Sequence, residues 1–145
     1  MSFQSWHNYG HGICTDDIKE HNIQRLKTLL SMAPIFEGKV QDRLSREAIT
    51  SPQWDDYMAY DTDYELGLAT ILNEVIGEAE GIALTACDDY NGKTYLLYQP
   101  KYPWELTDAE RGLTKKRVEE IFQRYVGILT DDFIPVGAQE VENGS

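Results

Sequence analysis

Carboxylates supply most of the chemistry available to this chain, and they are concentrated in one window. Between Arg46 and Lys93 the sequence contains 11 acidic side chains and neither lysine nor arginine. Of the 25 acidic residues, 14 remain outside the window beside 13 basic ones, so the net charge of −12 is a regional property. Such a region repels nucleic acid, attracts a basic protein surface or collects a cation. The window contains Glu47, Asp55, Asp56, Asp61, Asp63, Glu65, Glu74, Glu78, Glu80, Asp88 and Asp89.

Several of these carboxylates have a local structural explanation. Five precede or open predicted helices, where the helix dipole favours each negative charge by about 0.3–1 kcal/mol. Glu74 and Glu78 lack this explanation, because they lie four residues apart on the solvent face of a predicted helix that has no lysine. A like-charge pair at this spacing costs about 0.2–0.5 kcal/mol. The five explained residues are Asp55, Asp56, Asp61, Asp63 and Glu65.

Aromatic side chains are interleaved with the acids. Trp54 and Tyr57 are predicted to pack against the core, because they occur at helical spacing. Tyr60 and Tyr64 can then present flat apolar area to arginines of a partner, as interface anchors do. We predict that the protein mimics nucleic acid and occupies a basic protein surface, such as that of a nuclease or effector. A merely solvated acidic face is an alternative. The predicted partner-binding residues are Asp55, Asp56, Tyr60, Asp61, Asp63, Tyr64, Glu65, Glu74 and Glu78.

Two groups of residues resemble metal ligands. Residues 61–65 begin like a calcium-binding EF-hand loop, but Leu66 stands where glycine is needed and Leu72 where a bidentate glutamate is needed. His7, His11, Cys14 and Cys87 are residue types that bind zinc. On an alternating strand the two histidines lie on one face and Cys14 on the other, so only a bent strand brings them together. We expect no metal and no cofactor.

The same cysteines and histidines allow a further hypothesis, a thiolate paired with an imidazole. Aspartates follow each cysteine closely, and their charge raises the thiol pKa, which disfavours an activated thiolate. The sequence has no phosphate-binding glycine loop, serine elbow or paired metal-binding histidine motif. We predict that the protein is not an enzyme, and a small cysteine- or metal-dependent enzyme remains an alternative.

Direct binding of nucleic acid is disfavoured by the charge of the chain. Four basic residues gather on the last predicted helix, but acids are interspersed among them and the net charge opposes phosphate. This helix could contact the acidic window of its own chain or a second copy. The basic residues are Lys115, Lys116, Arg117 and Arg124.

Hydrophobic periodicity predicts strand, helices, hairpin, helix and strand in that order. Residues 3–14 form a strand, a helix begins at 15–17 and ends at Pro34, and a second covers 36–48. Another helix starts at Ser51-Pro52, and the clearest covers 68–79 and ends at Gly81. Thr107 and Glu110 form a capping box before the last helix.

The remaining elements complete an α+β fold. Asn91-Gly92 is predicted as the turn of a central hairpin that pairs Cys87 with Leu96. Residues 134–138 alternate as a closing strand. The result is a small, mainly antiparallel sheet of N-terminal strand, hairpin and C-terminal strand, packed with four to five helices. We expect a single domain over residues 1–145, with 142–145 frayed.

The sequence indicates a soluble, cytoplasmic protein. Its first ten residues lack the basic and apolar segments of a secretory signal, and no apolar run approaches the roughly 20 residues of a membrane span. Cys14 and Cys87 are too few for a disulfide framework.

Two segments suggest a biological context. Trp6-His7-Asn8-Tyr9-Gly10 and Gly67-Leu68-Ala69-Thr70-Ile71-Leu72 resemble small uncharacterised acidic proteins carried by phages and mobile elements of Firmicutes. This resemblance spans most of the chain and supplies no catalytic motif. Inhibitors of CRISPR and of other host defences are a familiar class among phage proteins of this size and acidity. The resemblance therefore implies an anti-CRISPR-like inhibitor that acts in the host cytoplasm.

Overall fold

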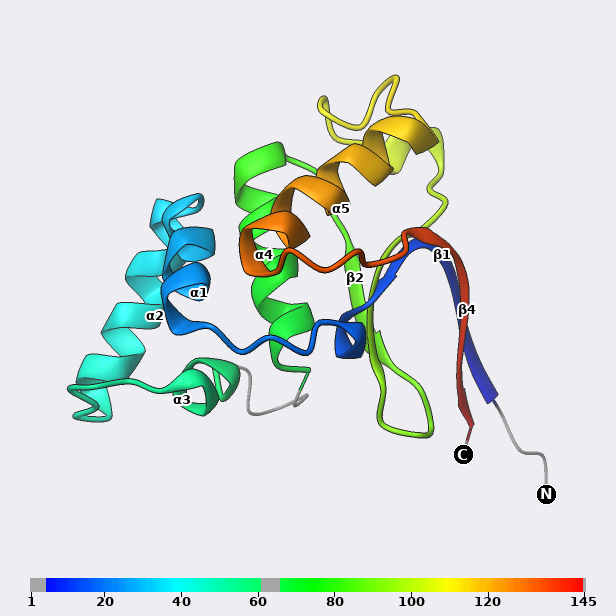
Figure 1. Cartoon of the computed structure of the whole chain (residues 1–145). Coiled ribbons are helices and arrows are strands. Elements are labelled where there is room, and N and C mark those ends of the chain that lie inside the picture. The colour runs from blue at the N-terminus through cyan, green and yellow to red at the C-terminus, as the bar shows by residue number, and fades with distance from the viewer. Residues whose placement is uncertain (1–4, 61–65, 145) are drawn as a thin grey trace.

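Four antiparallel strands form one sheet in the order β2-β3-β1-β4 (Figure 1). The computed structural model describes residues 5–60 and 66–144. Together with five α-helices, this sheet confirms the predicted α+β fold. The strands are β1 (Ser5–Cys14), β2 (Thr85–Asp88), β3 (Thr94–Tyr98) and β4 (Gly137–Gly144).

The helices lie in two layers on one side of the sheet (Figure 1). α4 contacts β2 and β3, α5 contacts β1, and α1 and α2 pack in turn against α5 and α4. The core between these layers is aliphatic and aromatic, and Tyr57 and Phe122 are among its largest fully buried side chains. The helices are α1 (Ile23–Ser31), α2 (Pro34–Arg46), α3 (Trp54–Met58), α4 (Leu68–Glu80) and α5 (Lys115–Leu129).

The structure agrees most closely with the prediction for α4, the helix with the clearest hydrophobic periodicity. α4 buries its apolar stripe and ends at Gly81, whose φ of 72° is the left-handed conformation that glycine adopts without strain. Ala79, the last residue of the predicted helix, is exposed and does not belong to this stripe. α2 ends before Ala48, which has a φ of 57° and is exposed, so the helix predicted over residues 36–48 ends earlier than expected.

Two predicted helix starts are wrong, and a predicted capping box is present but does not cap a helix. Thr15–Asp17 form a separate 3-10 helix, and α1 begins after Asn22, whose side chain accepts a hydrogen bond from the backbone N–H of Arg25. Gln53, and not Ser51, is the N-cap of α3. Thr107 and Glu110 do exchange the hydrogen bonds of a capping box, but a turn follows them, and Thr114 caps α5.

The predicted hairpin exists with a different register. Cys87 pairs with Tyr95, and Ala86 pairs with Leu96, one position away from the prediction. The backbone N–H of Gly92 donates to the carbonyl of Asp89, and only Gly92 has a positive φ, so the loop has three residues and not two. The hairpin is also not central, because β2 is an edge strand of the sheet.

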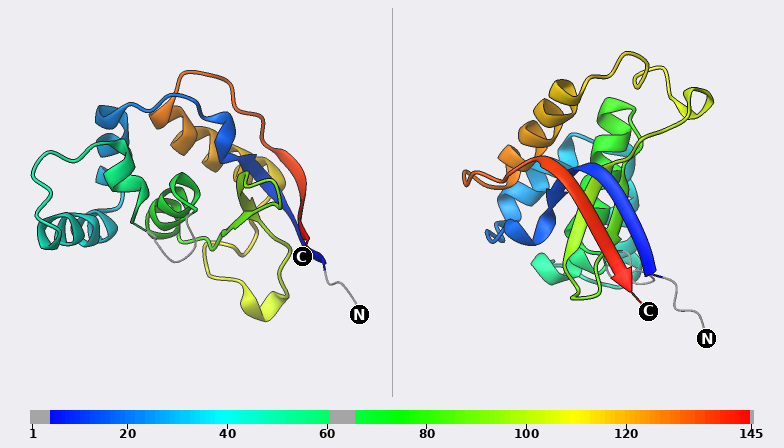
Figure 2. Two further views of the ribbon diagram at one scale, coloured as in Figure 1. Left: turned by 90° about the horizontal axis from the view of Figure 1, so that it is seen from below. Right: turned by 90° about the vertical axis from the view of Figure 1, so that its right-hand side faces the viewer.

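The two terminal strands form a long ribbon that curves away from the helices (Figure 2). β1 pairs with β4 from Ser5 to Gly12 and with β3 from His11 to Cys14. The predicted closing strand at 134–138 therefore starts later, at Gly137. Residues 142–144, expected to be frayed, are instead held by pairing with the first residues of β1. The ribbon also meets the hairpin loop, because Tyr90 donates its backbone N–H to the carbonyl of Glu142.

Candidate functional site

Two of the predicted partner-binding acids hold the ends of helices. The Glu78 carboxylate accepts hydrogen bonds from the backbone N–H groups of Ile35, at 3.0 Å, and Phe36, at 2.9 Å. The Asp56 carboxylate accepts one of 2.7 Å from the backbone N–H of Gln53, in the first turn of α3. Glu78 therefore has a structural partner that its position in the sequence did not suggest, and it is not a purely solvent-facing charge.

Basic residues from outside the acidic window neutralise part of it. Glu80 accepts a hydrogen bond of 2.8 Å from the Tyr125 hydroxyl, and Arg117 and Arg124 of α5 each lie 3.6 Å from its carboxylate. Arg43 pairs with Glu47 at 2.9 Å. The basic face of α5 therefore contacts the acidic window of its own chain, which was one of its predicted roles.

Asp55 and Glu74 differ from the other exposed acids in the described part of the window, because their carboxylates have no partner among the described residues. Both are exposed, and neither forms a hydrogen bond or an ion pair through its carboxylate with residues 5–60 or 66–144. Asp89 is held within the hairpin loop, where it accepts from the backbone N–H groups of Asn91 and Lys93. The other predicted contact residues, Asp61, Asp63, Tyr64 and Glu65, lie outside the described residues.

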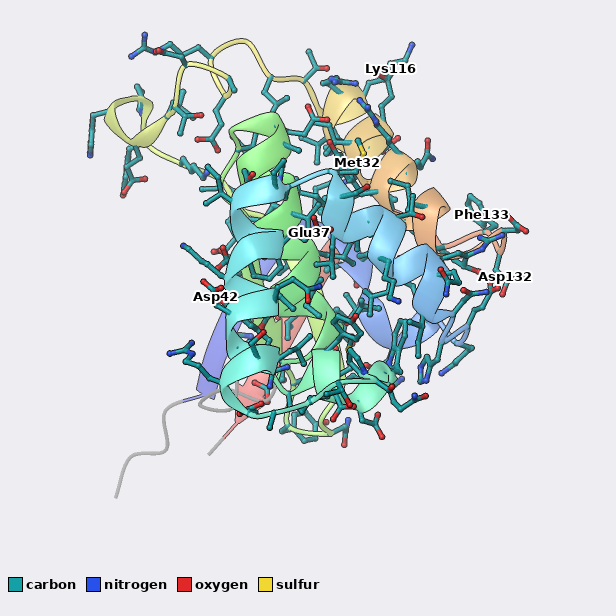
Figure 3. The ribbon with its side chains drawn as sticks, turned by 90° about the vertical axis from the view of Figure 1, so that its left-hand side faces the viewer. Met32, Glu37, Asp42, Lys116, Asp132 and Phe133 are labelled. Atoms are coloured by element: carbon teal, nitrogen blue, oxygen red, sulfur yellow. The ribbon has the colours of Figure 1, made fainter. Side chains whose placement is uncertain are left out.

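Glu74 lies in a groove between α2 and α4 with a volume of about 480 Å³. α2 contributes Lys39, Arg43 and Arg46 to this groove, so the surroundings of Glu74 are mixed in charge and not uniformly acidic. Tyr60 also lines the groove, half-buried, and packs edge-on against Phe36 with 5.0 Å between ring centroids. Figure 3 shows α2 in front of α4, with Glu37 and Asp42 labelled on α2.

The aromatic residues of α3 belong to the core. Trp54 is 8 % exposed and Tyr57 is 1 % exposed, as their helical spacing predicted. Trp54 also stacks on His21, with 4.6 Å between the ring centroids. Neither ring is available as an anchor for a partner.

The histidines and cysteines do not converge on a metal or on each other. Nδ1 of His7 lies 3.2 Å from Glu140, and Nε2 of His11 lies 3.0 Å from Glu119. Cys14 and Cys87 occupy strands on either side of β3, each paired with Tyr95. Within the described residues no three histidine, cysteine or acidic side chains are placed to hold a metal ion.

Both thiols are kept protonated by their surroundings. Burial raises the pKa of Cys87 to about 11, and the charges of Asp88 and Asp89 add to this effect. Burial likewise raises the pKa of Cys14, with a contribution from the charges of Asp17 and Asp16. The charges of the aspartates thus act in the direction that the sequence predicted, although burial is the larger cause and backbone hydrogen bonds from Asp16 and Asp17 oppose them at Cys14.

An exposed aromatic pair was missed by the sequence interpretation. Tyr102 and Trp104 are 63 % and 79 % exposed, and their rings stack with 4.7 Å between centroids. A 3-10 helix, Pro103–Glu105, holds them, and Glu105 accepts a hydrogen bond from the backbone N–H of Tyr102. The signal in the sequence was two aromatic residues on either side of a proline, outside any apolar period.

Comparison with protein-family models, with curated proteins and with solved structures finds no match to this chain. Among the described residues, no helix combines the length and apolar character needed to cross a membrane.

Proposed function

We propose that this chain is an acidic, phage-encoded inhibitor that occupies a basic nucleic-acid-binding surface of a host defence protein. The observation that supports the proposal is the placement of charge. The chain has a net charge of −12, and Asp55 and Glu74 are exposed acids of the window with no partner among the described side chains. A protein surface that binds phosphates is rich in lysine and arginine, and exposed carboxylates compete for the same cations.

The proposed contact surface is smaller than the acidic window. It consists of Asp55, Glu74 and Tyr60, together with Asp61, Asp63, Tyr64 and Glu65, which belong to it on sequence grounds alone. Asp56 and Glu78 are left out of it, because their carboxylates accept hydrogen bonds from backbone N–H groups at helix ends. Lys39 and Arg46 line the groove beside Glu74, so the strongest attraction for a basic partner is expected from Asp55 and residues 61–65.

The test is a charge-reversed variant and a matched control of equal net charge. Asp55→Lys/Glu74→Lys changes the proposed surface, and Asp17→Lys/Asp132→Lys changes two exposed acids outside the window. Each protein is used to capture partners from a Firmicute lysate, and the captured protein is then assayed for loss of nucleic-acid binding. We expect capture and inhibition by the natural protein and by the control, and reduced capture by the surface variant.

Salt provides the second arm of this test. Binding that depends on charge should weaken steeply when salt is raised from about 50 to 200 mM. Equal capture by both variants, or capture that is insensitive to salt, would rule the proposed surface out. Capture without loss of nucleic-acid binding would indicate an interaction protein that is not a mimic.

A further inference from the structure

A cavity of about 380 Å³ lies where the β1–β4 ribbon meets the beginning of α5. Its walls are largely apolar, and this volume is within the range of small-molecule sites, about 300–1,000 Å³. β1 and β4 contribute one wall, β3 contributes Tyr98, and the segment entering α5 contributes the rest. The larger side chains of the apolar wall are those of Tyr9, Tyr98, Leu113 and Val118.

The residues that line this cavity include a lysine and no acid, whereas the protein as a whole is negatively charged. No aspartate or glutamate lines it, although the chain has 25 acidic residues, and each of four other cavities is lined by at least one carboxylate. Lys115 lines the cavity and forms no ion pair with any described residue. Glu119, one helical turn after Lys115 on α5, does not line the cavity, and its carboxylate lies 3.0 Å from Nε2 of His11.

His11 forms part of the wall and is held in place by Glu119. Its side chain is only 13 % exposed, and its Nδ1 is buried without a hydrogen-bond partner among the described residues. Because Nδ1 is not accessible to solvent, Lys115 and not His11 is the group that can meet a charged ligand. The positive charge of Lys115 therefore favours a negatively charged ligand.

From the apolar walls and the unpaired Lys115, we propose that this cavity binds a small amphipathic carboxylic acid. The apolar part of the ligand packs against Tyr98, Leu113 and Val118, and its carboxylate pairs with the Lys115 ammonium. This site is separate from the acidic surface and is independent of the proposed inhibition. A cationic amphiphile is disfavoured, because it would bring a second positive charge to Lys115.

The experiment uses three ligands that have the same ten-carbon chain and differ in charge. Isotope-labelled protein is titrated with decanoate, decan-1-ol and decyltrimethylammonium, each below its micelle-forming concentration, and backbone amide shifts are followed by NMR. We expect saturable shifts at Gly10, Leu113 and Ala138, which line the cavity. Decanoate should bind most tightly and the cation most weakly.

Two lysine variants test the head-group contact. Lys115→Gln should weaken decanoate binding about fivefold, the effect of one partly exposed ion pair, and leave decan-1-ol binding unchanged. Lys116→Gln removes the same charge from the neighbouring position, which does not line the cavity, and should have a smaller effect. Equal weakening by both variants would show that only net charge matters and would overturn the assigned contact.

Three other outcomes would overturn the proposal. Equal affinity for decanoate and decan-1-ol would remove the preference for a carboxylate. Ligand-induced shifts confined to exposed apolar residues such as Trp104 and Phe133 would indicate surface adsorption. Concentration-dependent shifts at Gly10 and Ala138 without any ligand would show that a second copy of the chain covers the cavity.

Discussion

The carboxylate of Glu78, near the end of α4, accepts a hydrogen bond of 2.9 Å from the backbone N–H of Phe36, at the beginning of α2. Ala33 is the N-cap residue of α2 and has no side-chain acceptor for these N–H groups. Glu78 takes over that function from another helix, and it also supplies the negative charge that a helix N-terminus favours. A residue that seemed to require an external partner therefore has one inside the fold.

Replacing Glu78 with alanine should lower the free energy of unfolding by about 1–2 kcal/mol, because two N–H groups of α2 lose a charged acceptor. Glu74→Ala is the matched control on the same helix, and we expect a change within about 0.5 kcal/mol. Urea denaturation at neutral pH measures both. Equal losses for the two variants would contradict the capping role of Glu78.

Glu110 should make the stability of the fold sensitive to acid. Burial opposes its ionisation, but hydrogen bonds from Lys101 and Thr107 outweigh burial and lower its pKa to about 2. A carboxylate with a depressed pKa stabilises the fold above its unfolded pKa of about 4.3, and this stabilisation is lost as the pH falls toward 2.

Glu110→Gln should therefore destabilise the protein by about 3 kcal/mol at pH 7, because Lys101 loses its buried partner. The difference from the natural protein should shrink between pH 4.5 and pH 2, as the natural carboxyl becomes protonated. Thermal unfolding at a series of pH values measures this difference. A gap that stays constant over that range would mean that the charge of Glu110 is not the cause.

Gly12 is predicted to be irreplaceable. A Cβ atom at this position would lie 2.0 Å from the carbonyl oxygen of Leu96, which is backbone of β3 and cannot turn aside. Gly12→Ala should cost more than about 3 kcal/mol or prevent folding. The comparison is Gly38→Ala in α2, where an added Cβ meets nothing within 4 Å and helix propensity should raise stability by about 0.5–1 kcal/mol. Circular dichroism during urea denaturation distinguishes these outcomes.

The two thiols should react slowly in the folded protein. With its pKa raised to about 11, Cys87 has a thiolate fraction at pH 8 that is roughly a hundredfold or more below that of an ordinary cysteine of pKa 8.5. A disulfide reagent should modify both cysteines slowly in the native state and rapidly in denaturant. Labelling of native Cys87 at the rate of a free cysteine would show that burial does not protect it.

Hydrophobic periodicity in the sequence predicted the amphipathic helices. Val75 and Ile76 of α4 are fully buried, because a 3.6-residue apolar repeat permits only one core-facing orientation. The hairpin was placed correctly in the sequence, but its register was wrong by one. Asp89 stabilises a three-residue loop by accepting from the N–H groups of Asn91 and Lys93, and this competes with the two-residue turn that Asn-Gly favours.

The candidate site was less predictable, because a charge count does not reveal neighbours. Glu80 is one of the acids of the window in the sequence, yet in the fold it lies between Arg117, Arg124 and the Tyr125 hydroxyl. These residues are separated from it by more than 35 positions of chain. Only the packing of α5 beside α4 brings them together.

The sequence by itself determined the α+β fold, the buried faces of α4 and α5 and the excess of negative charge, because each is a property of local pattern or composition. The tertiary structure decided which acids remain available, since Glu78 and Glu80 find partners only when α2 and α5 pack against α4. The tertiary structure also formed one cavity that is lined by Lys115 and by no carboxylate, although the chain is strongly acidic. The cavity beside Lys115 combines residues from β1, β3, β4 and the start of α5, and no single segment of the chain contains it.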